Sequence, residues 1–161
     1  MGTKGSARAQ LALRYRSWGG RREGAGRPKS KDAGVPHGPR PKLSGREPVL
    51  VTLKVRKEIA SLRVRRVLLH VTAAVAKAVV RFGVRIVEYS VQRDHVHLLV
   101  EAASKAALSR AMKGLSVRLA RAIHRALSRK GTVFADRYHA RVLTTPRQTR
   151  NALAYVLCNG R

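Results

Sequence analysis

Acidic residues and cysteines are scarce in this chain, and each scarcity excludes a class of protein. Only 8 Asp and Glu stand against 35 Lys and Arg, which gives a formal net charge of +27 and a pI near 11.9. Such an excess indicates a polyanionic partner, with nucleic acid as the first candidate and an anionic membrane surface as the second. Cys158 is the only cysteine, which excludes an internal disulfide framework and a zinc site made of several cysteines.

Long apolar runs are absent as well. The longest ones are interrupted by Lys or Arg, so the sequence predicts no membrane span, and the first residues lack the apolar stretch of a signal peptide. We therefore expect a cytoplasmic protein whose apolar residues form a core. The length of 161 residues fits a single domain.

The composition changes sharply near Pro48. Five of the six prolines and nine of the thirteen glycines lie at or before it, and such a segment buries too little apolar surface to offset its chain entropy. We therefore expect a basic, mostly disordered arm at 1–47 and a folded domain at 48–161. The arm is either a solvated tail or a DNA contact. Within it, Gly26-Arg27-Pro28-Lys29 is similar to a minor-groove hook, which makes Arg27 a candidate DNA contact.

Downstream of Pro48, hydrophobic periodicity predicts alternating strands and helices. Runs rich in β-branched residues are typical of strands, whereas apolar residues spaced three and four apart are typical of helices. Ser104 can cap the second helix, and Thr145, Pro146 and Gln148 have a capping-box pattern for the third. The expected elements are a strand at 49–56, a helix at 62–81, strands at 84–91 and 95–102, a helix from 105 to about 130, a strand near 140–143 and a helix from 146 to about 158.

This order of elements matches the ferredoxin-like split βαβ pattern of the α+β class. We expect a four-stranded antiparallel sheet with the first two helices on one face. The last helix should pack beside the opposite face.

The third expected strand carries two histidines that share a face. Side chains of a strand alternate, so His95 and His97 point one way, while Val96, Leu98 and Val100 point the other way, toward the helices. Two imidazoles two residues apart lie roughly 7 Å apart at Cα, from about 3.4 Å rise per residue. They can converge on one metal ion.

The last expected helix carries a tyrosine suited to covalent chemistry. Leu153 and Leu157 are four apart and are the expected core side, so Tyr155 projects away from them, with Asn159 one turn beyond. A tyrosine oxygen can attack phosphorus and form a phosphotyrosine. Its reference pKa of about 10 makes it a poor nucleophile unassisted, and a metal ion on the scissile phosphate supplies the assistance.

Together these motifs resemble the single-tyrosine HUH transposases. His95-Val96-His97 and the segments from Gly131 to Arg141 and from Arg150 to Asn159 are similar to the REP-associated tyrosine transposase branch, and the resemblance covers roughly residues 48–159. It implies single-stranded DNA substrates, often with hairpins, Mg²⁺ or Mn²⁺, a 5′-phosphotyrosine and nucleoid association. It further implies that His95 and His97 bind the metal, that Tyr155 is the nucleophile and that Asn159 can complete the metal site.

Two departures from the family pattern bear on the site. The family often has Asn where this chain has Asp94, which either contacts the metal or shapes the turn, and we favour the turn. The sequence ends at Arg161, so we expect the tyrosine helix to be held weakly, in a truncated and weakly active or inactive enzyme. Tyr138 is a rival nucleophile, although its place before a strand favours a structural role.

Basic residues outside the site are the candidate DNA contacts. Arg118, Arg121 and Arg125 recur on one side of the second helix, and Arg137 precedes the strand near residue 140. They form either a solvated face or a phosphate-binding face, and the charge of the chain favours the latter. The alternative to a transposase is a non-catalytic nucleic-acid-binding protein on the same scaffold, a decayed or domesticated relative. A monomer and a homodimer both fit the sequence.

Overall fold

The computed structural model describes residue 38 and residues 43–78, 80–81 and 84–159, all within one compact unit, Gly34–Arg161. Almost all of the basic arm expected at 1–47 lies outside the described residues, and so does Arg27. Leu43, near the end of that segment, packs against the core of the domain. No helix in the described ranges is both long enough and apolar enough to cross a membrane.

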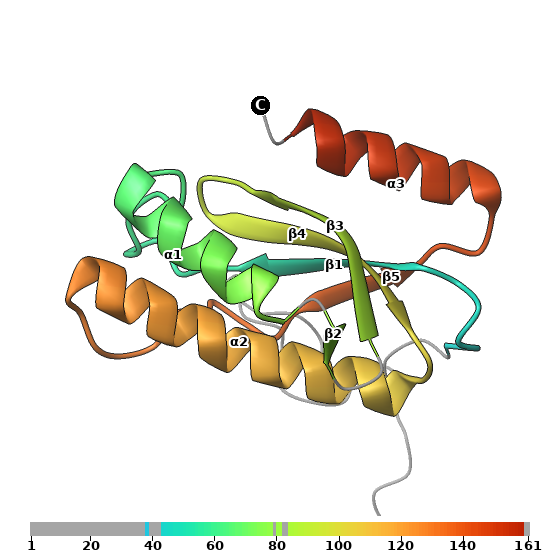
Figure 1. The fold of residues 1–161 in the computed structure, drawn as a ribbon, viewed down its shortest axis with the longest axis horizontal. Helices are drawn as coiled ribbons and strands as arrows, with labels where there is room; N and C mark the ends of the chain where they lie inside the picture. The colour runs from blue at the N-terminus through green and yellow to red at the C-terminus, as the bar shows by residue number, and fades with distance from the viewer. Residues whose placement is uncertain (1–37, 39–42, 79, 82–83, 160–161) are drawn as a thin grey trace, which may run out of the picture. The chain divides into compact units, whose positions relative to one another are not determined.

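The folded part is an antiparallel sheet with helices on both faces. The strands follow the order β2-β3-β4-β1-β5 across the sheet. Figure 1 shows α1 and α2 on one face and α3 on the other. Apart from the two-residue β2, this is the predicted ferredoxin-like arrangement with an added helix. The elements are β1 (Val49–Lys54), α1 (Arg65–Ala76), β2 (Val80–Arg81), β3 (Val84–Val91), β4 (His95–Ala102), α2 (Lys105–Leu127), β5 (His139–Val142) and α3 (Pro146–Cys158).

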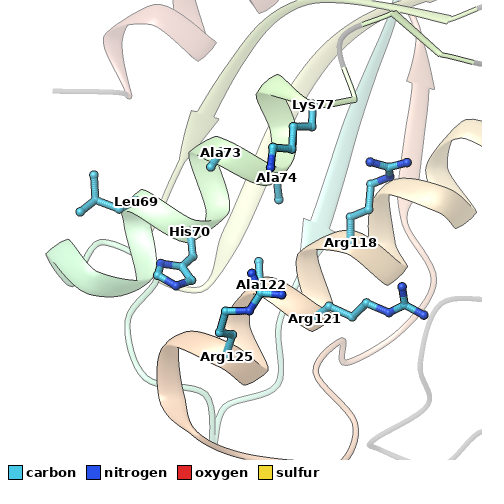
Figure 2. Close-up of a pocket in the computed structure, with 9 residues that line it drawn as sticks. All are labelled: Leu69, His70, Ala73, Ala74, Lys77, Arg118, Arg121, Ala122 and Arg125. Carbon is cyan, nitrogen blue, oxygen red and sulfur yellow. The ribbon is translucent and has the colours of Figure 1, made fainter.

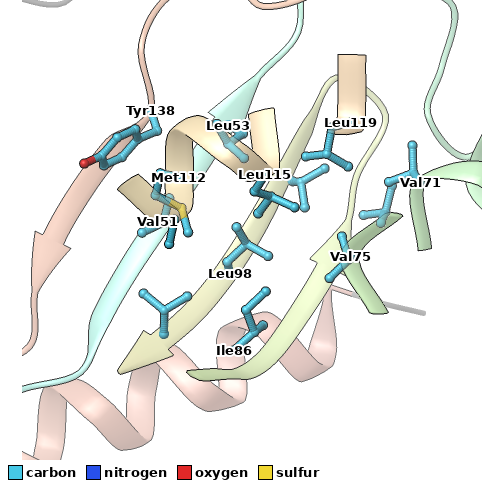
Figure 3. Close-up of a cluster of buried hydrophobic side chains, with 14 of the residues drawn as sticks. Val51, Leu53, Val71, Val75, Ile86, Leu98, Met112, Leu115, Leu119 and Tyr138 are labelled. Atoms are coloured by element: carbon cyan, nitrogen blue, oxygen red, sulfur yellow. The ribbon is translucent and has the colours of Figure 1, made fainter. Parts of the chain in front are cut away.

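The main core lies between the sheet and the pair α1 and α2, as the periodicity predicts. Strand alternation places Val51, Leu53 and Leu98 on this side, and the valines of α1 and the apolar stripe of α2 cover them (Figure 3). Full burial of one such side chain stabilises the fold by about 1.5–3 kcal/mol. The core therefore fixes which face of β4 remains for function. Its fully or nearly fully buried helix residues are Val67, Val71, Val75, Met112, Leu115, Leu119 and Ile123.

The first helix is shorter than the sequence predicts. It ends at Ala76, and Val80 and Arg81 form the edge strand β2 instead, paired with Arg85 and Val84. Valine is β-branched and favours a strand over a helix where a partner strand is within reach. The sheet consequently has five strands, not four. The second helix also stops sooner than expected, because Ser128 adopts a left-handed conformation with φ of 49°.

Helix α3 contacts the sheet through a stripe that only partly matches the predicted one, because Leu153 packs against the small cluster of Leu99, Leu143 and Ala152 but Leu157 does not. Its buried residues are Ala152 and Val156, whereas Leu157 is 51% exposed. Small side chains let a helix approach a sheet closely, and Ala152 packs against Leu99. Tyr155 is one residue, or about 100°, from Val156. The tyrosine therefore flanks the contact with the sheet and does not point away from it.

Both ends of α3 are held by side chains. At the start, Thr145 Oγ1 accepts a hydrogen bond from the Gln148 amide at 3.2 Å, and Gln148 Oε1 accepts one from the Thr144 amide at 2.9 Å. This confirms the predicted cap, except that Gln148 reaches the residue before Thr145. At the other end, Gln92 Nε2 donates to the Asn159 carbonyl. The weak attachment expected for this helix is thus not what the described residues show.

Truncating the buried stripe of α3 should destabilise the protein more than truncating its exposed leucine. Val156→Ala removes methyl groups that are 1% exposed, so we expect a loss of about 1–3 kcal/mol in the free energy of unfolding. Leu157→Ala removes more carbon atoms, but from the surface, and should change that free energy by less than about 0.5 kcal/mol. Urea denaturation measures both. Equal losses would show that the predicted Leu153 and Leu157 stripe was right after all.

Candidate active site

Three side chains meet between β4 and α3. The two Nε2 atoms of His95 and His97 are 3.0 Å apart, and Tyr155 Oη lies 3.2 Å from His97 Nε2. The rings of each pair meet edge to face, with centroids 4.5 Å apart for the histidines and 5.1 Å apart for His97 and Tyr155. The structure thus brings together the two predicted metal-binding histidines and the predicted nucleophile.

Each histidine is oriented by a hydrogen bond at Nδ1, the ring nitrogen that does not face the other histidine. His95 Nδ1 lies 2.7 Å from Asp94 Oδ1, and His97 Nδ1 lies 3.0 Å from Thr52 Oγ1. A carboxylate only accepts hydrogen bonds, so His95 carries a proton on Nδ1, and a metal ion at this point would be bound by its Nε2. Tyr155 donates to His97 Nε2 when His97 likewise donates from Nδ1 to Thr52. Both Nε2 atoms then face the same point.

Two acceptor nitrogens this close repel unless a proton or a cation lies between them. Their separation of 3.0 Å suits a shared metal ion, because two neighbouring octahedral ligands about 2.1 Å from Mg²⁺ are about 3.0 Å apart. Within the described residues, no group of three or more His, Cys, Asp or Glu side chains could hold a metal. Two histidine nitrogens would leave an octahedral ion several positions for oxygen ligands.

The electrostatics of the site keep His97 neutral. Burial lowers the pKa of His97, and the charge of His95 lowers it further. The hydrogen bond from His95 lowers the pKa of Asp94, and the charges of His95 and Lys54 act in the same direction. Asp94 therefore stays ionised and holds His95 through the nitrogen remote from His97. Asp94 thus orients the ring of His95. This role differs from both the metal contact and the shaping of the turn that the sequence suggested.

The site continues as a polar row across four strands. Thr52 pairs with His97 on one side and with His139 on the other, and His97 pairs with Ser90 on β3. The sequence did not single out Thr52, and for His139 it left a substrate contact or a surface residue open, with the surface residue favoured. One signal was present: Thr52 is the only polar residue between Val49 and Leu53, and it follows Leu50 on the face opposite the core.

A cavity of about 530 Å³ opens beside this row, between α3 and the strands β1 and β5. Tyr155 and His97 border it together with Arg141 of β5 and Asn151 of α3. Tyr155 is 48% exposed, so part of its side chain can be reached from solvent. The rival Tyr138 is 8% exposed and belongs to the core on the other face of the sheet (Figure 3).

Other predicted site residues lie apart from the three. Asn159 caps the end of α3, and its carbonyl accepts a hydrogen bond from Gln92, but no hydrogen bond within the described part of the chain joins its side chain to either histidine. Arg137 borders a cavity next to α2, along with Tyr138. Figure 2 shows the three predicted arginines of α2 beside α1, around a second cavity of about 320 Å³. These arginines are Arg118, Arg121 and Arg125.

The sequence matches a known protein family, and the fold is similar to solved structures. A family model described as "Transposase IS200 like" matches residues 48–157, well over half of the chain. No curated protein matches the sequence. The fold is similar to a REP-associated tyrosine transposase bound to a REP hairpin, with a TM-score of 0.61 and 14% identity over 78% of this chain and 72% of that one. It is also similar to a putative transposase from Deinococcus radiodurans R1, with a TM-score of 0.52 and 21% identity over 80% and 98%.

The pKa of His97 is open to direct measurement. In metal-free protein we expect it below the ordinary value of about 6.5, because burial disfavours the imidazolium and His95 adds repulsion. His95→Asn removes only the second cause, so it should raise the pKa of His97 without restoring the ordinary value. NMR titration of the ring protons in EDTA measures both proteins. A wild-type pKa of 6.5 or higher would contradict this description of the site.

Proposed function

Because the chain belongs to the family of IS200-like transposases, we propose that it cleaves and rejoins single-stranded DNA through Tyr155. The observation that carries this proposal is the convergence of Tyr155 Oη and the two histidine Nε2 atoms, with distances of 3.2 and 3.0 Å. Binding alone requires neither a tyrosine hydroxyl nor a pair of imidazoles at one point. The alternative, a non-catalytic nucleic-acid-binding protein, does not explain why the tyrosine hydroxyl and the two histidine nitrogens converge.

The reaction begins when Tyr155 Oη forms a bond to phosphorus and the bond from phosphorus to the 3′ oxygen breaks. The tyrosine proton leaves Oη, the 3′ oxygen departs as a 3′-OH after taking up a proton, and the 5′ phosphate remains on Tyr155. Rejoining reverses these changes, because a 3′-OH attacks phosphorus and Tyr155 recovers its proton. The arrangement of Tyr155 beside the sheet holds Oη within reach of the same phosphate in both steps.

We further propose that His95 and His97 hold a Mg²⁺ or Mn²⁺ ion. When bound, such an ion withdraws charge from the scissile phosphate and fixes its orientation. Asp94 and Thr52 keep the two Nε2 lone pairs directed at the ion, and Asn159 remains a candidate for a further ligand by its match to the family motif. His97 has one lone pair at Nε2, so it can serve either the ion or the hydroxyl of Tyr155, not both together.

A second part of the proposal concerns the groove between α1 and α2 (Figure 2). Arg118, Arg121 and Arg125 border it from α2, and His70 and Lys77 border it from α1. None of the described residues that line it is a carboxylate, and it lies on the face of the sheet opposite α3. We propose that this groove contacts phosphates of a DNA hairpin or flank, a partner consistent with the hairpin bound to the similar transposase. Arg137 and Arg27 remain proposed contacts of the same kind.

Removal of one hydroxyl tests the nucleophile. Tyr155→Phe should eliminate the covalent protein–DNA adduct that wild-type protein forms with labelled single-stranded DNA and Mn²⁺, because no other oxygen occupies that position. The fold should persist, since the volume is nearly unchanged. The matched variant Tyr138→Phe removes a hydroxyl on the other face of the sheet and should leave the adduct in place. Denaturing gels show the adduct. Loss of the adduct in Tyr138→Phe alone would identify Tyr138 as the nucleophile. Absence of the adduct from the wild type would favour the non-catalytic alternative.

Metal binding can be measured without DNA. His95→Ala and His97→Ala should abolish Mn²⁺ binding observed by electron paramagnetic resonance, and Asp94→Asn should weaken it about tenfold or more, as loss of a ligand's hydrogen-bond partner does. Tyr155→Phe should bind Mn²⁺ at least as tightly as the wild type, because the competing hydroxyl is gone. His70→Ala serves as the control. DNA cleavage that continues in EDTA would refute a metal role.

The groove is tested by the salt dependence of DNA binding. Each phosphate contact contributes about one to the slope of log affinity against log salt concentration. Arg121→Gln should therefore make the slope for a labelled hairpin shallower by about one. Arg110→Gln removes the same charge from an exposed position of α2 outside the groove and should change the slope less. Equal changes would mean that the groove has no particular contact with DNA.

A further inference from the structure

The cavity beside Tyr155 is lined by apolar, basic and amide side chains in addition to Tyr155 and His97. Its walls come from β1, β5 and α3, and its volume of about 530 Å³ lies within the range of about 300–1,000 Å³ typical of small-molecule sites. Leu50 and Leu143 provide apolar surface, Arg141 and His139 provide positive or neutral donors, and Asn151 provides an amide. None of the described residues around it is acidic.

The strand register explains why the two β5 side chains face this cavity. His139 is paired with Thr52, and Arg141 is paired with Leu50. Thr52 lies on the α3 side of the sheet, where its hydroxyl contacts His97. Residues two apart on a strand share a face, so Arg141 lies on the same side as His139. Both are exposed, and Arg141 forms no ion pair with any described residue. An anion can therefore pair with it without displacing a protein partner.

The amide on α3 is also available. Asn151 lies four residues before Tyr155 and therefore on the same side of the helix. Its neighbour Gln148 uses Oε1 to accept from Thr144, but Asn151 forms no hydrogen bond through its side chain within the described residues. An asparagine amide presents a donor and an acceptor together, which suits the edge of a nucleobase.

We propose that this cavity binds the nucleotide next to the scissile phosphate, with Arg141 pairing the phosphate on its far side and Asn151 bonding to the edge of its base. This inference rests on the proposed function, because it takes Tyr155 to mark the scissile phosphate. A strand held at Tyr155 has its next nucleotide within reach of the cavity, and the leucines give the base an apolar surface to lie on. Arg141 supplies affinity for any nucleotide, whereas Asn151 distinguishes between bases.

The test uses the four deoxynucleoside 5′-monophosphates as probes and the methyl resonances of the leucines as reporters. Leu50 and Leu143 line the cavity, whereas Leu69 lines the groove between α1 and α2. Millimolar nucleotide should shift the Leu50 and Leu143 methyl signals and not those of Leu69, with different dissociation constants for different bases. Shifts confined to Leu69, or no shift with any nucleotide, would overturn the proposal.

Variants of Arg141 and Asn151 test the phosphate contact and the base contact separately. Arg141→Gln should weaken binding of all four nucleotides about tenfold, as loss of a charge-assisted contact does, while Arg150→Gln, an exposed arginine of α3 outside the cavity, should leave it unchanged. Asn151→Leu should narrow the differences between bases. Equal weakening by Arg141→Gln and Arg150→Gln would reduce the effect to general charge and contradict the proposal. Binding of nucleoside monophosphates requires no cleavage, so a failure of the strand-transfer proposal would not mimic a failure of this one.

Discussion

The alternation of β4 between two different layers is the constraint on which the rest of the structure depends. Val96, Leu98 and Val100 must face α1 and α2, because they are buried in the main core. His95 and His97 are thereby directed to the other face, where α3 closes over them. A register slip of one residue would exchange the two sets and place both imidazoles in an apolar layer. Core packing thus fixes the direction of the site side chains.

The site is built from pairs in which one residue fixes another. Asp94 orients His95, Thr52 orients His97, and Ala152 with Val156 seats the helix that carries Tyr155. Of these supporting residues, Thr52 comes from a strand distant in sequence from the ring that it places, whereas Asp94, Ala152 and Val156 lie within a few residues of the groups that they place. A polar site half covered by a helix needs such partners, because an unpaired polar group near the core destabilises the fold.

Much of this architecture could be predicted from the sequence, and the failures have physical causes. The period-two pattern of β4 revealed its two faces, and the cap at Thr145 is local chemistry, so both could be read directly. The contact of Thr52 with His97 depends on the register between β1 and β4, which no local pattern contains. In α3, the pairs Ala152 with Val156 and Leu153 with Leu157 both have helical spacing. Hydrophobicity favoured the leucines, whereas close approach to the sheet favoured the smaller residues.

The central claim is that Tyr155 becomes covalently attached to DNA, and peptide mapping tests it most directly. Wild-type protein is incubated with single-stranded DNA and Mn²⁺, digested with nuclease and trypsin, and examined by mass spectrometry. Cleavage after Arg150 places Tyr155 in the peptide 151–161 and cleavage after Arg137 places Tyr138 in the peptide 138–141. Our account predicts a nucleotide phosphate on Tyr155 in the first peptide. A nucleotide on Tyr138, or on no peptide while the DNA is cut, would contradict it.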